Sequence, residues 1–540
     1  MMRKILIPCF YFLSPAAALG QNETLLYHTI QTDKDGNITP WYNADPAKSY
    51  DHVINLVWNF WDTMRTDING LPYYMNHQVW RTGFDDPRGM GGDQLQMALS
   101  SWRFLYEYTG NERVKENMCF IAGYYLTHGL SPSNCLWPDI PFPYNTLIYS
   151  GIFDGDMTIG KDFTQPDKAG SFGLELVHLY KIKNNDVYLD AAIKIANTLI
   201  AHIHQGDADH SPLPFKVNVF TGKPGFLKVH ANERDGKSTD TACYTSNWAP
   251  AMQLFLDLIQ LNKGKVSSYK KAFTLFLTWM KKYPLATNKW GPFFEDVAWW
   301  SDTQINAMTF ARFIMENREY FPEWRTQVKN IIEWVHKNFA NDKWKKYSVI
   351  VTNEQTIYQT PGESHTSRQG ADELLYTSLS GDSTYYFNAI RQLTWATYMV
   401  DVDGKNCFPF DENWLTDGYG DYVRHYLRAM ATMPSLAPDE DHILSTTSVI
   451  QQVDYKGSLR KFLVPDFDNV DTNKVRLFYR AFDNVGTERI RMKNRPSRVL
   501  LNDKPINENT GGEGYEWKEL SSGGLLTVNR QNGNRVIIIE

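Results

Sequence analysis

The sequence contains little cysteine, and its cysteines do not form closely spaced pairs. Five Cys occur among 540 residues, and none belongs to a CxxC motif. This spacing excludes a cysteine-rich zinc site and a dense disulfide framework. A chain of this length buries a hydrophobic core without covalent help, so disulfides are possible but not required.

Long hydrophobic runs, an excess of positive charge and nucleotide-binding motifs are also missing. After residue 20, no stretch approaches the roughly 20 apolar residues of a membrane-spanning helix. The formal net charge is −6 and no basic region suggests a nucleic-acid partner. A glycine-rich phosphate loop and a nucleophile elbow are absent. We therefore expect no membrane span, no nucleic-acid partner and no cofactor, and the oligomeric state stays open.

The first 20 residues have the pattern of a secretory signal peptide. Arg3 and Lys4 precede an apolar run that ends in Ala-Leu-Gly before Gln21. Cleavage at this point would remove two positive charges and change the formal net charge from −6 to −8. The pattern predicts a soluble protein released into a periplasm or the medium.

Within a predicted domain of residues 21–436, the chain from Tyr50 to about Leu436 is predicted to form helices in pairs. Apolar residues recur at helical spacing, and short polar turns such as Thr109-Gly110-Asn111 and Asn184-Asn185-Asp186 separate the partners. About twelve helices follow, the first near residue 51, with inner helices expected to begin near 93, 170, 247, 302, 371 and 421. An even number of hairpins with longer connections before every second helix predicts a closed (α/α)6 toroid of six helical hairpins.

Residues 437–540 have a different pattern. Short alternating or β-branched runs, among them KVRLFYRAF, LLTVNR and RVIIIE, are separated by turns rich in Asp, Asn and Gly. They predict a small antiparallel, β-sandwich-like domain after the ring.

The chain resembles the six-hairpin glycosidase superfamily, the (α/α)6 toroids that include many glycoside hydrolases and several polysaccharide lyases. The resemblance covers nearly all of the mature chain and rests on this architecture and on phrases such as GDQLQMALSSWRFLYEYTGNE and SPLPFKVNVFTGK. It implies a carbohydrate substrate, an oligo- or polysaccharide. The 14 % content of aromatic residues is consistent with stacking on sugar rings as well as with a large core.

Candidate site residues lie in the six loops that precede the expected inner helices, because these loops meet at one end of a closed ring. The loops are residues 76–93, 153–170, 238–248, 292–302, 361–372 and 408–421. The substrate-binding candidates are their aromatic, cationic and polar side chains: Asn76, His77, Trp80, Arg81, Lys168, Tyr244, Trp248, Trp299, Trp300, Arg368, Trp414 and Asp417.

Paired carboxylates in these loops favour a glycoside hydrolase, which needs one protonated and one ionised carboxyl group. Glu295 and Asp296 lie between Phe293-Phe294 and Trp299-Trp300, an apolar environment that would raise a carboxyl pKa. Asp154 and Asp156 form a second pair, although Asp-Gly is also ordinary turn chemistry. Asp93, Asp302, Asp372 and Asp421 are interpreted first as helix caps.

The alternative is a polysaccharide lyase that removes the proton next to a uronate carboxylate by means of a Tyr or His base. Glu363, His365 and Tyr419 are its catalytic candidates, and Arg81 or Arg368 would bind the carboxylate in either reaction. Basic residues in the loops favour a uronic-acid-containing substrate. A sugar epimerase or a non-catalytic glycan-binding protein is the third alternative.

We expect no metal site. The His204, Asp207, Asp209 and His210 group matches no standard ligand spacing.

Overall fold

The computed structural model describes most of the chain after the predicted signal peptide. The described residues are 23–75, 92–147, 150–156, 160–227, 241–294, 299–407, 419–455, 474–509 and 511–540, with only the backbone described at 92–94, 156, 419 and 420. The predicted signal peptide lies outside these residues. In the part of the chain that is described, no helix combines the length and hydrophobicity needed to cross a bilayer.

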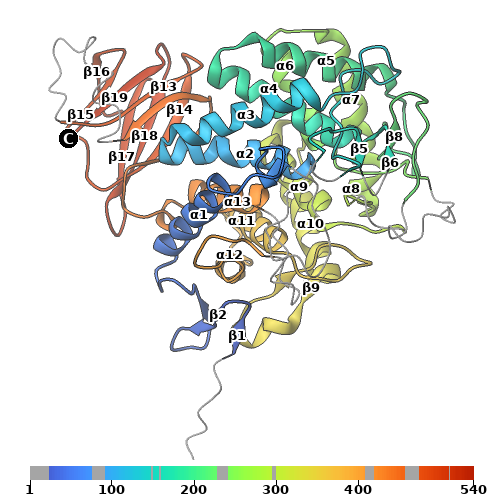
Figure 1. Ribbon diagram of the computed structural model, residues 1–540. Helices are drawn as coiled ribbons and strands as arrows, with labels where there is room; N and C mark the ends of the chain where they lie inside the picture. The colour runs from blue at the N-terminus through green and yellow to red at the C-terminus, as the bar shows by residue number, and fades with distance from the viewer. Residues whose placement is uncertain are drawn as a thin grey trace, which may run out of the picture.

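Six inner helices form a closed ring, in which each packs against the next and the last returns to the first (Figure 1). They are α2 (Gly92–Thr109), α4 (Pro166–Lys183), α6 (Ala249–Gln260), α9 (Gln304–Glu316), α11 (Glu363–Ser380) and α13 (Tyr419–Thr432). The outer helices are α1 (Pro46–Asp62), α3 (Glu112–His128), α5 (Asp186–His202), α7 (Val266–Lys282), α10 (Trp324–Phe339) and α12 (Tyr386–Thr397). The predicted toroid is therefore confirmed.

The hairpins run from an inner helix to the next outer helix, and α1 closes the ring. Inner helices α2, α4, α6, α9 and α11 each pack on the outer helix that follows them, whereas α1 packs on α13 and, through Trp58 and Trp61, on Trp102 of α2. The predicted turns are also found, because Asn111 caps α3, Asn184 ends α4 in the left-handed conformation and Asn185 caps α5.

Short elements occupy the loops. The strand pairs are β1 (Thr24–Leu25) with β2 (His28–Thr29), β3 (Gln31–Thr32) with β4 (Ile38–Thr39), β5 (Gly155–Asp156) with β6 (Gly160–Lys161), β7 (Phe163–Thr164) with β8 (Val217–Asn218), and β9 (Ala340–Asn341) with β10 (Val351–Thr352). Short helical segments are α8 (Pro284–Thr287) and the 3-10 turns Tyr73–Met75, Arg318–Tyr320, Asp342–Tyr347 and Pro434–Leu436.

The C-terminal part folds as two antiparallel sheets. One has the order β11 (His442–Thr446), β14 (Gly486–Met492), β18 (Gly524–Arg530), β17 (Gly514–Glu519). The other has the order β12 (Ile450–Tyr455), β13 (Val475–Ala481), β19 (Arg535–Ile539), β15 (Arg498–Leu501), β16 (Lys504–Ile506). A buried Arg530–Glu488 ion pair, joined by the Tyr479 hydroxyl, links the two sheets. The predicted β domain after the ring is confirmed, whereas the boundary at 436/437 stays a prediction.

The β sheets pack on the carboxyl ends of the inner helices, beside α2 in Figure 1. His442 stacks on Tyr108 of α2, and the Gln451 side chain donates to the carbonyl of Lys181 in α4. Gly110 permits this approach, because a Cβ atom there would lie 2.9 Å from the Tyr455 ring. The β domain thus packs on the carboxyl ends of α2, α4 and α13, away from the amino ends of the inner helices.

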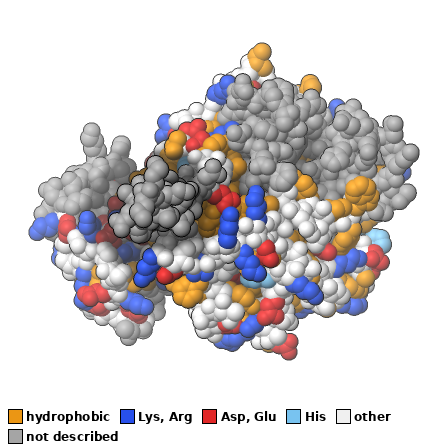
Figure 2. Space-filling model, turned by 90° about the horizontal axis from the view of Figure 1, so that it is seen from below, with side chains coloured by type: hydrophobic (Ala, Val, Ile, Leu, Met, Phe, Trp, Pro, Cys, Tyr) orange, Lys and Arg blue, Asp and Glu red, His pale blue; other side chains and the backbone are white. Residues whose placement is uncertain are grey.

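The surface and the thiols are unexceptional. On the face shown in Figure 2, acidic and basic side chains of the described residues are intermixed with hydrophobic patches. The four cysteines in the described part of the chain, Cys119, Cys135, Cys243 and Cys407, are not joined in disulfides.

Glu107 of α2 makes the contact with the β domain sensitive to pH. Its side chain is buried beside Arg103, and burial raises the pKa of its carboxyl group from 4.5 to about 7. Because the folded protein binds this proton more tightly than the unfolded chain, stability should fall as pH rises from 4.5 to about 7. We expect Glu107→Gln to raise the free energy of unfolding by about 3 kcal/mol above pH 7 and to change it little near pH 4.5.

Urea unfolding at acidic and alkaline pH measures this difference. Glu116→Gln, at an exposed position of α3, is the matched control and should not change the pH dependence. An equal stability gain from Glu107→Gln at both pH values would contradict the assignment.

Candidate active site

The amino ends of the inner helices meet at one end of the ring, which we call the mouth. The long connections from each outer helix to the next inner helix all end here, as expected from the loop lengths. One correction concerns α11, which begins at Glu363 and not near residue 371. Glu363, His365 and Arg368 therefore lie on helix α11 itself and not in a loop before it.

His365 has the features of a general base. It lies in the first turn of α11, its side chain is 5 % exposed, and neither ring nitrogen has a hydrogen-bond partner in the structure. Burial, together with the positive charge of Arg368, holds the pKa of the imidazole well below its ordinary value of 6.5. The Phe294 ring lies 5.9 Å from it. The imidazole is therefore neutral, the state that a general base needs before the reaction, and neither nitrogen is tied to another group, although burial and Arg368 also weaken it as a base.

Arg368 belongs to a buried ionic network centred on Asp421 of α13. It donates to Gln304 at 3.1 Å and to the Asp421 carboxylate. Arg424 also pairs with Asp421, and His425 approaches the same carboxylate at 3.1 Å. Two guanidinium groups thus share one carboxylate, which leaves local positive charge next to His365.

A second polar group lies at the start of α4. Asp167 and Lys168 follow Pro166 in the first turn and are both buried. Asn247 donates to Asp167 at 2.9 Å, while Lys168 donates to the Phe293 carbonyl at 3.0 Å and lies 3.2 Å from the centre of the Phe293 ring. These contacts join the first turn of α4 to the segments that precede α6 and α9.

A cavity of about 140 Å³ lies inside the ring, next to Lys168 and Arg368. It is lined by residues of all six inner helices. Its charged lining residues are the cations Lys168, Arg312, Arg368, Arg424 and Arg428 and the carboxylates Glu175, Glu316 and Asp372. Burial, with neighbouring cations, lowers the pKa values of Arg368 and Arg428, and burial lowers that of Arg424 to about 10. Since arginine keeps its charge, the lining has five cations for three carboxylates, and two further buried carboxylates lie beside it, Asp167 paired with Lys168 and Asp421 paired with Arg368 and Arg424.

Several predicted site residues lie outside the described part of the chain. They are Asn76, His77, Trp80, Arg81, Glu295, Asp296, Trp414 and Asp417. The side chains of Asp156 and Tyr419 are likewise not described. Their proposed roles stay predictions.

The remaining predicted residues are distributed over the mouth and the core. Glu363 is buried at the start of α11. Asp154 accepts hydrogen bonds from the backbone amide and the hydroxyl of Thr146, eight residues earlier in the chain. Trp248 is fully buried against Phe276 and Tyr244 donates to the Lys289 carbonyl, whereas Trp299 and Trp300 remain 61 % and 36 % exposed.

The capping interpretation fails for two aspartates. Asp372 lies inside α11, because the helix begins nine residues before it. Its carboxylate accepts a hydrogen bond from Arg312. Asp302 precedes the α9 cap and accepts hydrogen bonds from the backbone amides of Trp290 and Gly291 instead.

Asp167, Asn247, Gln304, Arg424 and His425 were not predicted from the sequence. A usable signal existed for two of them, since Arg424 and His425 follow Asp421 at the helical spacings of three and four. The other three contact partners that are distant in sequence.

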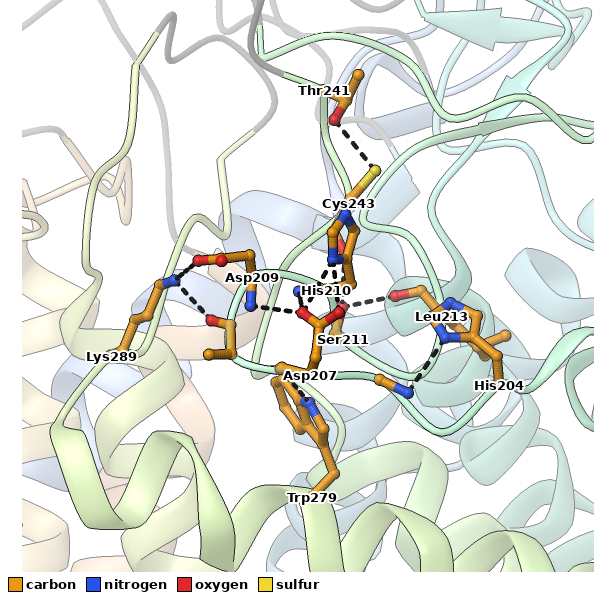
Figure 3. Close-up of polar contacts among 12 residues, drawn as sticks. His204, Asp207, Asp209, His210, Ser211, Leu213, Thr241, Cys243, Trp279 and Lys289 are labelled. Atoms are coloured by element: carbon orange, nitrogen blue, oxygen red, sulfur yellow. Dashed lines mark hydrogen bonds and ion pairs between the residues drawn. The ribbon is translucent and has the colours of Figure 1, made fainter.

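The His204–His210 group is a hydrogen-bonded loop (Figure 3). The Asp207 carboxylate accepts from the backbone amides of Asp209 and His210 and contacts the His210 ring at 2.9 Å, while Asp209 pairs with Lys289. Among the described residues, no group of three or more acidic, His or Cys side chains is arranged to hold a metal ion.

No family model matches the sequence, and no curated protein matches it. Solved structures match the fold. A cellobiose 2-epimerase from Spirochaeta thermophila aligns at 12 % identity over 72 % of this chain and 97 % of its own, with a TM-score of 0.54. A sugar epimerase from a ruminal bacterium aligns at 10 % identity over 70 % and 98 %, with a TM-score of 0.50. A D-mannose isomerase aligns at 11 % identity over 73 % and 100 %, also at 0.50. The chain therefore has the six-hairpin (α/α)6 fold that these structures share.

Proposed function

We propose that the protein is a carbohydrate-processing enzyme that cleaves a uronic-acid-containing glycan by β-elimination, with His365 as general base. The observation that carries this proposal is the buried, neutral imidazole of His365 with both nitrogens uncommitted. A base of this kind can remove the proton from the carbon next to a sugar carboxylate. The electron pair forms a carbon–carbon double bond, and the glycosidic oxygen leaves and is protonated.

The charge of the site supports an acidic substrate. Removal of this proton builds negative charge on the carboxylate, which nearby cations stabilise. Lys168, Arg368 and Arg424 line the cavity, and two carboxylates pair with these three cations, Asp167 with Lys168 and Asp421 with the two arginines. The predicted signal peptide supports action outside the cytoplasm.

Hydrolysis is the second candidate. In the sequence, Glu295 and Asp296 directly follow Phe294, whose ring lies 5.9 Å from that of His365. A pair of carboxylates would suit a glycoside hydrolase.

An assay with purified protein and a panel of uronic-acid and neutral oligosaccharides separates these reactions. We expect products that absorb near ~230 nm, the signature of a new unsaturated uronate. Products heavier by one water without this absorbance would favour hydrolysis through Glu295 and Asp296. A changed sugar configuration at unchanged chain length would favour an epimerase. Failure to process any member of the panel would contradict an enzyme of this class.

A further inference from the structure

An exposed apolar surface lies at the mouth, outside the cavity. Trp299 and Trp300, directly before α9, are 61 % and 36 % exposed, and Ile357 and Tyr358, in the loop before α11, are each 45 % exposed. We call these four residues the rim platform. Large aromatic side chains are unfavourable in water. A cluster of them that stays exposed beside a site therefore indicates that a ligand covers them.

The two loops that carry the rim platform are joined to each other. Thr303 and Gln355 form an antiparallel bridge, and the backbone amide of Thr356 donates to the Asp302 carbonyl at 3.0 Å. The amide of Ile357 donates to the Ser301 hydroxyl at 3.3 Å. Because these loops lead directly into α9 and α11, the rim platform is continuous with the segment that carries His365.

Trp300 is held rigidly although it is partly exposed. Its indole nitrogen donates to Asp302 at 3.3 Å, and the Tyr244 ring lies 5.0 Å away. Gly291 allows this packing, since a Cβ atom there would lie 2.7 Å from the Tyr244 ring and 3.4 Å from that of Trp300. Preorganisation of this kind lowers the entropy lost when a ligand binds.

The loop of His204 to His210 supports the same group through Lys289 (Figure 3). Lys289 donates to the Ala208 carbonyl at 2.6 Å and pairs with Asp209 at 2.8 Å. Its ammonium group lies 4.7 Å from the centre of the Trp300 ring and 4.9 Å from that of Tyr244. This polar loop thus fixes a cation against the aromatic rings of the mouth.

We propose that the rim platform is a distal sugar-binding subsite, on which Trp299 and Trp300 stack a pyranose ring of the glycan beyond the bond that reacts. This inference rests on the proposed function and adds that the enzyme selects extended chains over disaccharides. Stacking on an aromatic face uses the apolar C–H face of the sugar and requires no charge on it. The subsite therefore accepts neutral as well as acidic residues of the chain.

The test measures binding by tryptophan fluorescence and calorimetry with oligogalacturonides and cello-oligosaccharides, from disaccharide to hexasaccharide. For the unmodified protein we expect affinity that rises with chain length. The Trp299→Ala/Trp300→Ala variant should lose about ten-fold in affinity for the hexasaccharide and nothing for the disaccharide. Phe387→Ala, which removes an aromatic ring that is 68 % exposed on outer helix α12, is the matched control and should bind all lengths normally.

The outcomes separate this inference from the proposed function. Length-dependent binding that the double variant loses supports the subsite, even if no glycan is turned over. Turnover with equal affinity for all lengths, or a double variant that binds the hexasaccharide normally, overturns the subsite and leaves the proposed function intact. The absence of binding to every chain overturns the subsite as well.

Discussion

His365→Gln should lower kcat/KM on the uronic-acid substrate by about a hundred- to ten-thousand-fold, the range that a positioned general base contributes. Glutamine has nearly the shape of histidine and can form hydrogen bonds, but it cannot accept a proton at neutral pH. Because neither nitrogen of His365 has a hydrogen-bond partner in the structure, the exchange breaks no structural bond there. Initial rates measured over a range of substrate concentrations provide the comparison.

The pH profile gives a second readout. The pKa of His365 is lowered, mainly by burial, so the imidazole stays unprotonated and able to act as a base as pH falls. We expect activity to persist below pH 6.5, the ordinary value for this group.

The matched control is His128→Gln, at an exposed histidine on outer helix α3. It should retain full activity. A His365→Gln variant that is folded, as judged by an unchanged thermal unfolding midpoint, and still fully active would exclude His365 as the base. In that case Glu295 and Asp296 become the residues to replace.

Much of the ring could be predicted from the sequence because its determinants are local. The turns at Thr109-Gly110-Asn111 and at Asn184-Asn185-Asp186 carry capping residues that end one helix and begin the next. Apolar residues at helical spacing mark the faces that pack between inner and outer helices. The β runs were equally visible, since β13, β18 and β19 are rich in branched residues.

The start of α11 could not be predicted, and the reason is physical. Its first turns bury polar side chains, among them Glu363, His365, Arg368 and Asp372, which face an ionic interior and not a hydrophobic core. Hydrophobic periodicity therefore gives no helical signal here, and Gly362 and Gly370 add the composition of a loop.

The site was only partly predictable because ring closure creates it. His365 and Arg368 were identified from residue type and position in one segment. Their environment comes from elsewhere, since Gln304 and Asp421 are separated from Arg368 by 64 and 53 residues. A single sequence does not indicate which charges such a closure brings together.

The Asp421 carboxylate should be among the most important buried groups for stability. It is 2 % exposed and pairs with the guanidinium groups of Arg368 and Arg424, while His425 lies 3.1 Å from it. Asp421→Asn keeps the size of the side chain but removes the negative charge, so two buried cations lose their counter-ion. We expect the free energy of unfolding to fall by about 3–5 kcal/mol, measured by urea unfolding.

Asp382→Asn is the matched control, because Asp382 pairs with Lys329 at 2.9 Å near the protein surface. Such a pair is screened by solvent, and its loss should lower the free energy of unfolding far less than Asp421→Asn does. Arg368→Met combined with Asp421→Asn should cost less than the sum of the two single changes, since Asp421→Asn alone leaves Arg368 without its counter-ion and the double variant removes that cation. Equal costs for Asp421→Asn and Asp382→Asn, or strict additivity in the double variant, would show that the buried network does not hold the inner ring together.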